Sequence, residues 1–317
     1  MDELVVGIDI GGTNTEIGLV TRNGKCLIAS TIPTNTHGRF EDYISSISKE
    51  ITNLYSTYKN NYTLKGIGIG APNGSFSLGS IVDAPNLAWK GTLPLCSEIT
   101  KQVGLPAVVT NDANAAALGE MLFGSAKGMK DFIVITLGTG LGSGIVVNGK
   151  LVVGHDGFAG ELGHITVEEN GRLCGCGKKG CLEAYVSAPG IKKTIFKMLA
   201  YHTNPSIFRS ISFENLTAKM ITEEALKGDP IAREAFEYTG KILGIKLADV
   251  VATLSPEAIF FFGGLAKAGQ LLFEPTKRHM EENLFPIFRN KVELLSSGLD
   301  GENTAVLGSA ALIWQEL

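Results

Sequence analysis

Two segments of the chain share one pattern of apolar and polar positions. The first runs from Leu4 to Lys25 and the second from Phe132 to Lys150. Each contains an apolar strand, a glycine-rich turn, a second strand and an Asn-Gly pair of the kind that closes a β-hairpin. Superposing Gly11 on Gly138 leaves a one-residue difference in length before the later glycines. The pattern predicts two related halves that each begin with a β-meander, with a chance likeness of two short segments as the alternative.

After each meander the pattern alternates between helical and extended spacing. Apolar residues recur about every 3.6 positions from Phe40 to Tyr58, which predicts an amphipathic helix. The other predicted elements are strands at residues 64–72 and 107–110, an alanine-rich helix after the second of these, helices at 188–201 and from Asp229-Pro230 to about 254, a strand at 257–264 followed by a helix, and a buried helix over 303–314. Strands followed by alternating helices and strands, twice over, predict an α/β protein with mixed sheets.

The length of 317 residues exceeds what one hydrophobic core usually supports and predicts two domains. The net charge of −4 gives no electrostatic case for binding nucleic acid or an anionic membrane. The first residues show no secretory signal, and no apolar run approaches the roughly 20 residues of a membrane-spanning helix. Because three of the five cysteines are clustered, a reducing compartment fits better than export, and we expect a cytoplasmic protein.

One histidine and three cysteines stand in a short glycine-rich stretch with a spacing that suits a metal ion. His164 is followed by Cys174, Cys176 and Cys181, and the glycines between them let the loop curl. A set of three cysteines and one histidine closes a tetrahedral zinc shell without an open position, so we expect structural zinc and no zinc-bound water chemistry. The alternatives are a loop of free thiols and a zinc site unrelated to any ligand.

Two carboxylates bracket the cysteine cluster, Glu161 before it and Glu183 after it. Taken singly, each is an ordinary surface charge. Their position beside the predicted zinc loop favours a second interpretation, in which they accept hydrogen bonds from neighbouring hydroxyls of a sugar. Asn86 and Asn111 are further candidate acceptors, and His164 can bind the metal through one ring nitrogen and a hydroxyl through the other.

Two glycine-rich turns and one glycine pair are candidates for holding phosphate groups. The backbone N–H groups of such turns can surround an anion, although tight hairpins that need glycine are the alternative. Neither turn has the spacing of a P-loop, and each is followed by a strand and not by the helix of a dinucleotide fingerprint. Asp9 either bonds its own turn or holds Mg²⁺ through water beside the phosphates. The candidate residues are Asp9, Gly11, Gly12, Thr13 and Asn14 in the first turn, Gly138, Thr139 and Gly140 in the second, and the pair Gly263-Gly264 after a later strand.

Asn111 and Asp112 stand where a predicted strand ends and the alanine-rich helix begins. Asn and Asp are favoured residues at helix N-termini, so capping explains both. In the alternative, Asp112 accepts a proton from a substrate hydroxyl while Asn111 holds that hydroxyl or its neighbour. Phosphoryl transfer depends on positioning and charge neutralisation more than on a strong base, so an aspartate without a raised pKa suffices.

The motifs, taken together and in their order, resemble those of the ROK family (repressors, open reading frames, kinases), and within it the bacterial glucokinases. The resemblance covers nearly the whole chain. Its motifs are DIGGT (residues 9–13), NDANAA (111–116), LGTGLGSG (137–144), GELGH (160–164), CGCGKKGCLE (174–183) and FFGG (261–264).

The resemblance implies a two-domain actin-like, ribonuclease-H-like fold of the hexokinase type, with a cleft between lobes that close over the substrate. We expect a smaller α/β domain of residues 1–118, on which a C-terminal helix of about residues 300–317 packs. Residues 119–299 are expected to form a larger α/β domain that carries the zinc loop. Members of the family usually phosphorylate the 6-hydroxyl of a hexose with ATP and magnesium, and we expect glucose to be converted to glucose 6-phosphate.

The resemblance also implies a role for each candidate residue. Asp112 is expected to be the catalytic base, the two glycine turns to hold the phosphates, and Gly263-Gly264 to lie near the adenosine. The expected sugar-binding residues are Asn86, Asn111, Asp112, Glu161, His164 and Glu183. The expected zinc ligands are His164, Cys174, Cys176 and Cys181. A homo-oligomer, dimer or tetramer, is expected from the family as well.

One departure from the family lies in the loop APNGSF (71–76), where a Gly-Pro pair is usual after Ala-Pro. Asn73 can alter the sugar loop, so N-acetylmannosamine, N-acetylglucosamine, mannose and fructose are alternative substrates. The repressor branch carries a DNA-binding helix-turn-helix ahead of the first phosphate motif, which begins here at Asp9. We therefore expect an enzyme, with a non-catalytic sugar sensor as the remaining alternative.

Overall fold

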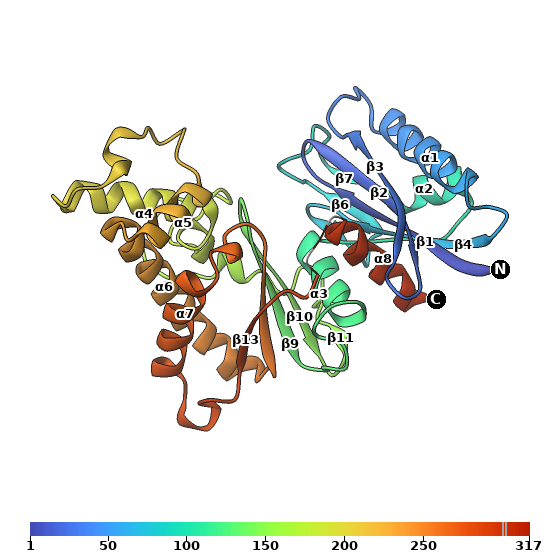
Figure 1. The fold of residues 1–317 in the computed structure, drawn as a ribbon. Helices are drawn as coiled ribbons and strands as arrows, with labels where there is room; N and C mark the ends of the chain where they lie inside the picture. Colours follow the sequence, from blue (N-terminus) through green and yellow to red (C-terminus); the bar gives the residue numbers. More distant parts are fainter. Residues whose placement is uncertain (300, 302) are drawn as a thin grey trace.

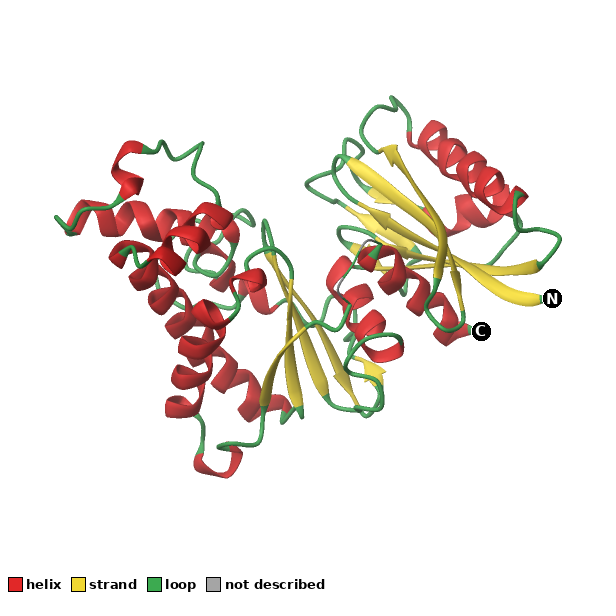
Figure 2. Cartoon of the chain, in the orientation of Figure 1, coloured by secondary structure: helices red, strands yellow, loops and turns green. Residues whose placement is uncertain are grey.

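Two five-stranded sheets, one in each lobe, form the frame of the molecule, as Figure 1 and Figure 2 show. The computed structural model describes residues 1–299, 301 and 303–317. Both sheets have the same plan: an antiparallel meander of three strands and, beside its first strand, two more strands that run parallel to it. The shared plan confirms the predicted pair of related halves.

The strand order is β3-β2-β1-β4-β8 in the first sheet and β11-β10-β9-β12-β13 in the second. The strands of the first sheet are β1 (Asp2–Ile10), β2 (Asn14–Thr21), β3 (Cys26–Pro33), β4 (Tyr62–Gly70) and β8 (Ala107–Thr110). Those of the second are β9 (Phe132–Leu137), β10 (Leu141–Val147), β11 (Lys150–Leu151), β12 (Ala258–Phe262) and β13 (Glu293–Ser296). A small third sheet, which the sequence did not predict, contains β5 (Gly74–Ser75), β6 (Ser80–Val82) and β7 (Thr92–Leu93).

The first hairpins of the two halves differ by one residue in their glycine-rich turns. Ile10 pairs with Thr15 across residues 11–14, whereas Leu137 pairs with Leu141 across residues 138–140. This is the difference in length that the superposition of the two sequence segments predicts. Both turns lie at the same end of equivalent strands.

Helices cover both faces of each sheet. On β9 the side chains of Ile133 and Ile135 join the core formed with α4 to α7, while those of Phe132 and Val134 face the opposite core, as the two-residue period of a strand requires. The helices are α1 (Phe40–Ser56), α2 (Leu95–Val103), α3 (Asp112–Leu122), α4 (Ala188–Tyr201), α5 (Ala218–Lys227), α6 (Pro230–Leu254), α7 (Gln270–Asn283) and α8 (Thr304–Glu316). The short 3-10 helices are η1 (Leu162–His164), η2 (Leu182–Ala184), η3 (Ile207–Ser210), η4 (Ala266–Ala268) and η5 (Pro286–Phe288). None of the described helices is long and apolar enough to cross a membrane.

A row of glycines lets α8 lie directly on the first sheet. Gly18, Gly7 and Gly68 are neighbours across β2, β1 and β4. A Cβ atom on Gly7 would stand 2.1 Å from the carbonyl oxygen of Val306, and one on Gly68 would stand 1.9 Å from that of Ser309. Because any side chain at these positions would push the helix away, the glycines set the distance between α8 and the sheet.

Helix α3 packs on α8 and on the second sheet, so these two helices stand between the sheets (Figure 1). A Cβ on Gly308 of α8 would lie 2.6 Å from the carbonyl oxygen of Ala115. On the other side, a Cβ on Gly144 of β10 would lie 2.6 Å from Ala117. Small residues on both sides of α3 thus bring the two halves into close contact through one helix.

A buried carboxylate at the end of α3 holds both chain segments that pass between the lobes. Glu120 accepts hydrogen bonds from the backbone N–H of Ser125, at 2.9 Å, and from that of Leu299, at 3.3 Å, and from the hydroxyl of Ser297. Ser125 lies between α3 and β9, and Ser297 and Leu299 follow β13 on the way to α8. These bonds tie the outgoing and returning segments together.

The two predicted domain boundaries, at residues 118 and 300, can be compared with the observed helices and strands. Helix α3 continues to Leu122, past the boundary predicted at residue 118. The boundary predicted at residue 300 lies outside the described residues. The division at these two positions stays a prediction.

Replacing Gly68 by alanine is expected to destabilise the protein, because the new methyl group would overlap the backbone of α8. Overpacking of this kind typically lowers the free energy of unfolding by about 1–3 kcal/mol. Urea unfolding followed by circular dichroism measures the change. Gly38→Ala is the control, since a Cβ at Gly38 meets no atom within 4 Å. Equal stability of the two variants would contradict the close packing of α8.

Candidate active site and metal centre

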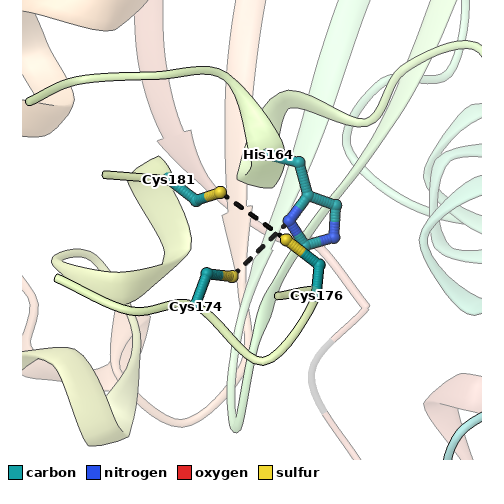
Figure 3. A group of neighbouring side chains, drawn as sticks. All are labelled: His164, Cys174, Cys176 and Cys181. Atoms are coloured by element: carbon teal, nitrogen blue, oxygen red, sulfur yellow. Dashed lines mark hydrogen bonds between the residues drawn. The ribbon is translucent and has the colours of Figure 1, made fainter. Parts of the chain in front are cut away.

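The predicted metal ligands come together in the loop between β11 and α4 (Figure 3). His164 ends η1, Cys174 and Cys176 lie on a turn, and Cys181 directly precedes η2. The backbone N–H of Gly177 donates to the carbonyl of Cys174 and closes that turn. The ligand atoms of all four residues lie within 4.8 Å of one another. The local fold of this loop therefore gathers one imidazole and three thiols at one point.

The spacing of these atoms fits a tetrahedral ion. The Sγ atoms of Cys176 and Cys181 are 3.7 Å apart, and Nδ1 of His164 is 3.7 Å from Sγ of Cys174. Zinc–sulfur bonds of about 2.3 Å in a tetrahedron place two sulfurs about 3.8 Å apart. The donor set is also the one that structural zinc sites use. The residues present thus fit zinc, with Nδ1 of His164 directed at the metal position.

Glu183 joins this cluster to the second glycine turn. One carboxylate oxygen accepts from the thiol of Cys174 at 3.3 Å, and the other accepts from the backbone N–H of Leu141 at 3.0 Å. A Cβ on Gly140 would lie 2.4 Å from the same carboxylate, so glycine is required for this approach. The backbone oxygen of Glu183 further accepts from the hydroxyl of Ser187 at the start of α4. The loop, the turn and α4 are thereby fixed together.

Glu161 lies on the other side of the cluster, beside His164. Its carboxylate is 3.9 Å from Nε2 of His164, the ring nitrogen that does not face the sulfurs. Burial raises the pKa of Glu161; His164 opposes this shift, and the charges of Asp112 and Glu183 add to it. These contributions indicate that the carboxylates of Asp112 and Glu183 lie near that of Glu161.

Asn111 and Asp112 stand at the N-terminus of α3, between β8 and the helix. The side-chain oxygen of Asn111 accepts from the backbone N–H of Asn114 at 2.7 Å, so Asn111 is the helix cap. The carboxylate of Asp112 accepts from the backbone N–H of Ala113 at 2.8 Å. Solvent reaches the side chain of Asp112, but the protein around it removes much of its hydration, and this burial raises its pKa. Capping is thus observed for Asn111, and the amide nitrogen of Asn111 takes no part in that cap.

Asp9 lies near the end of β1, next to Gly70 of β4. Burial, with smaller contributions from the charges of Asp112 and Glu16, raises the pKa of Asp9 to about 7. Asp9 belongs to the first half of the chain, whereas Glu161 and Glu183 belong to the second. Asp112 begins α3, and this helix packs on β4 of the first sheet and on β9 and β10 of the second. The charge of Asp112 also raises the pKa of Asp9 and that of Glu161.

The two glycine turns are closed by their own backbone and held by neighbouring segments. In the first, Gly11 donates to the carbonyl of Asn14 at 2.9 Å, and Thr34 of the following segment donates to that of Thr13 at 2.8 Å. In the second, Gly138 donates to the carbonyl of Gly140 at 3.0 Å. Thr13, Asn14 and Thr139 are exposed at the tips. Both turns keep their outer atoms open to a ligand.

The glycine pair after β12 stands beside the second turn. Gly263 has a φ of +102°, and a Cβ there would lie 2.6 Å from the carbonyl oxygen of Leu137, the last residue of β9. The N–H of Leu265 donates to that same carbonyl at 3.0 Å. Gly264 is exposed. The structure thus places Gly263-Gly264 next to the turn of residues 138–140.

Comparison with known proteins decides which family has this arrangement. A family model described as "ROK family" matches residues 5–316. The chain is 36% identical to a glucokinase from Halalkalibacterium halodurans, over 99% of this chain and 96% of that protein. The chain belongs to the ROK family.

Two further similar proteins show the range of functions among the relatives. A ROK glucokinase from Streptomyces griseus, solved in complex with glucose and AMPPNP, is 33% identical, with a TM-score of 0.78 over 98% of both chains. This likeness confirms the actin-like fold of the hexokinase type that the sequence predicts. A xylose repressor from Bacillus spizizenii is 30% identical over 97% of this chain and 76% of the repressor.

Sequence reasoning missed two residues that shape the loop around Asn86 in this ROK chain. The ammonium of Lys90 donates to the carbonyls of Ala84 and Leu87, both at 2.9 Å, and to that of Pro85 at 3.3 Å. Asn35 bonds this loop to the first glycine turn. Both donate to backbone carbonyls, which every residue type offers, so no pattern in the sequence identifies them.

Asn73, which the sequence singled out as a departure from the family, also acts on this loop. At a φ of 51°, it donates to the carbonyls of Val82 at 3.0 Å and Asp83 at 3.3 Å.

Removing one thiol should release the metal and weaken the site next to it. We expect about one zinc ion per chain in the wild-type protein and less in Cys176→Ser, by elemental analysis. Sugar affinity should fall at least about 10-fold, because Glu183 and His164 are held by the same loop. Titration calorimetry measures the affinity.

The control for this variant is Cys26→Ser, since Cys26 lies on β3, outside the cluster. If metal-free Cys176→Ser kept full sugar affinity, the metal cluster would have no role in sugar binding.

Proposed function

We propose that the protein transfers the γ-phosphoryl group of ATP to the 6-hydroxyl of a hexose, with glucose as the preferred acceptor. The observation that carries this proposal is the position of Asp112 at the start of α3, the helix that packs on both sheets. The first half contributes Asp9 and the first glycine turn, and the second half contributes Glu161, Glu183 and the cysteine loop. The charge of Asp112 influences the pKa of Asp9 and that of Glu161. A proton acceptor at that point can face a sugar hydroxyl and a phosphate at once.

The loop around the cysteine cluster has the chemistry of a polyol site. Glu161 and Glu183 supply carboxylate oxygens. An ionised carboxylate can only accept hydrogen bonds, and a sugar hydroxyl can donate them. Nε2 of His164 is turned away from the sulfurs and towards Glu161. In this proposal Asn86 and the free amide of Asn111 complete the set that holds the sugar. Bound zinc would stabilise the conformation of the loop that presents these groups.

The two glycine turns and the neighbouring glycine pair have the chemistry of a nucleotide site. In this proposal backbone N–H groups of the turns donate to phosphate oxygens, and the adenosine lies at Gly263-Gly264 beside the second turn. Asp9 would hold, through water, the Mg²⁺ that accompanies ATP and neutralises phosphate charge. The Streptomyces griseus relative, solved with glucose and AMPPNP, supports a sugar and a nucleotide as the ligand pair.

In the proposed reaction Asp112 orients the 6-hydroxyl and accepts its proton as the oxygen attacks the γ-phosphorus. The bond from that phosphorus to the bridging oxygen breaks, and ADP leaves. The raised pKa of Asp112 strengthens it as a base, although phosphoryl transfer relies mainly on position. The N-terminal end of α3 fixes that position, because the backbone N–H of Ala113 holds the carboxylate.

A non-catalytic sugar sensor is the second candidate function, since a xylose repressor is 30% identical over 97% of this chain. In that case the sugar site would be retained, but hexose would not be phosphorylated. Measurable sugar binding without ATP consumption would support this function.

The test of the proposed function is a coupled ATP-consumption assay over glucose, mannose, fructose, N-acetylglucosamine, N-acetylmannosamine and xylose. We expect kcat/KM to be highest for glucose, in keeping with the glucokinase relatives. A clear preference for an N-acetyl sugar would overturn the proposal that glucose is the preferred substrate, but it would support the proposed phosphoryl transfer. Absence of turnover with every hexose would overturn the reaction.

Asp112→Asn is expected to lower kcat by roughly 10²–10⁴-fold while sugar affinity changes little, because the amide keeps the shape of the side chain and loses the base. Stopped assays give kcat, and calorimetry gives the affinity. The control is Asp249→Asn, which removes an exposed carboxylate paired with Lys246 on α6.

The pH dependence provides a second check on the role of Asp112. A base must be ionised, and burial raises the pKa of Asp112 above the usual 3.8. Wild-type kcat/KM should therefore fall on acidification with an apparent pKa above that value, and Asp112→Asn should lose this dependence. Near-normal turnover of the variant would remove Asp112 from the role.

A further inference from the structure

One carboxamide connects the candidate phosphate turn to the candidate sugar loop. Asn35 follows β3, and its Nδ2 donates to the carbonyl of Gly12 in the first turn and to that of Asn86 at 3.2 Å. Its Oδ1 accepts from the backbone N–H of Ala88 at 3.1 Å. The side chain therefore contacts two segments that are separated by more than seventy positions in the sequence.

The partners determine how the amide of Asn35 is oriented. The N–H of Ala88 can only donate, so it must face the oxygen of the amide. The carbonyls of Gly12 and Asn86 can only accept, so both must face the NH₂ group. Only a carboxamide of this length offers an acceptor and two donors in that arrangement. An aspartate in the same place would keep the bond to Ala88 and direct a negative charge at two carbonyl oxygens.

The two connected segments lie in direct contact. A Cβ on Gly12 would stand 3.0 Å from the carbonyl oxygen of Asn86 and 3.2 Å from its Cβ. Because they are packed closely, a displacement of the turn also displaces the loop. The ammonium of Lys90 fixes the shape of the loop through three carbonyls of residues 84–87, but those bonds do not reach the turn. Asn35 bonds to both.

The segment that carries Asn35 is itself well anchored. The backbone N–H of Thr34 donates to the carbonyl of Thr13 at 2.8 Å. The hydroxyl of Thr34, which is buried, bonds that of Thr15 at 2.8 Å, and Thr15 in turn bonds the hydroxyl of Tyr43 on α1 at 2.6 Å. Asn35 thus extends from a well-anchored segment to the exposed surface of the site.

We propose that Asn35 is a positioning residue that sets the phosphate turn and the sugar loop at one fixed separation, so that nucleotide and sugar are aligned together. This inference rests on the proposed function, in which the turn binds phosphate and Asn86 binds sugar. A displacement of about 1 Å between two reacting groups can cost on the order of 10²-fold in rate. A residue that touches neither ligand then governs turnover.

The test compares Asn35→Asp and Asn35→Ala with the wild-type protein in the ATP-consumption assay. We expect kcat to fall about 10–100-fold and the KM values of sugar and ATP to rise together, each about 2–10-fold. Asn35→Asp should be affected at least as strongly as Asn35→Ala, because its charge faces two carbonyls. The melting temperature should stay close to that of the wild type, since the bonds of Asn35 lie at the surface.

The matched control is Asn23, an exposed asparagine whose side chain, within the described part of the chain, bonds only to Thr21 of its own turn. Asn23→Asp and Asn23→Ala should leave kcat and both KM values unchanged. Wild-type kinetics in the Asn35 variants would overturn the proposal. A rise in one KM alone would also overturn it, because Asn35 would then support one segment without joining the two.

Calorimetry separates failure of this inference from failure of the proposed function. The sugar that binds best and AMPPNP are titrated separately into the wild-type protein and Asn35→Asp, and both dissociation constants should rise about 2–10-fold in the variant. These measurements need no turnover. If the wild-type protein phosphorylates no hexose, the proposed kinase activity fails, while the paired change in affinity still decides whether Asn35 couples the two segments.

Discussion

The close contact of α3 with both halves of the molecule is the constraint on which the rest of the structure depends. Gly308 allows α8 to approach α3, and Gly144 allows β10 to approach it from the opposite side. Without these glycines the two sheets could not share one central helix at this distance. The first turn of α3 carries Asp112, so the packing that joins the halves also places a carboxylate where they meet.

The second half contributes a preformed loop to that meeting point. Four metal-ligating side chains gather within a single stretch of sequence, and Glu183 connects them to the turn of residues 138–140. Because a metal bond is stronger than the hydrogen bonds of a loop, an ion there would limit how far Glu161 and Glu183 can move. The first half contributes the other side of the site through loops that hydrogen bonds of Asn35 and Lys90 hold in place.

Burial raises the pKa values of three carboxylates in this site, and neighbouring like charges add to the shift in two of them. Burial, then the charges of Asp112 and Glu16, raise the pKa of Asp9 to about 7. Burial raises the pKa of Asp112, and burial with the charges of Asp112 and Glu183 raises that of Glu161. A ligand that brings hydroxyl donors or a cation opposes these shifts, because each stabilises the ionised carboxylates. The same electrostatic environment therefore favours both the binding of such a ligand and the acceptance of a proton by a carboxylate.

The sequence by itself determined most strands of the two large sheets, the longer helices, the duplicated plan and the metal-ligand cluster, but not α2, α5 or the small third sheet. These features depend on signals that act over a few residues: apolar spacing, Asn-Gly and Asp-Pro pairs, a cap at Asn111, and the spacing of one histidine and three cysteines. Only the tertiary structure decided that the carboxylate of Asp112 lies near enough to Asp9 and Glu161 to raise their pKa values. It also decided that Asn35 joins Gly12 to Asn86. The physical reason is that these contacts cross between separate elements and involve charges or backbone carbonyls. A carbonyl is common to all residues, so its partner becomes evident only when packing has brought the two segments together.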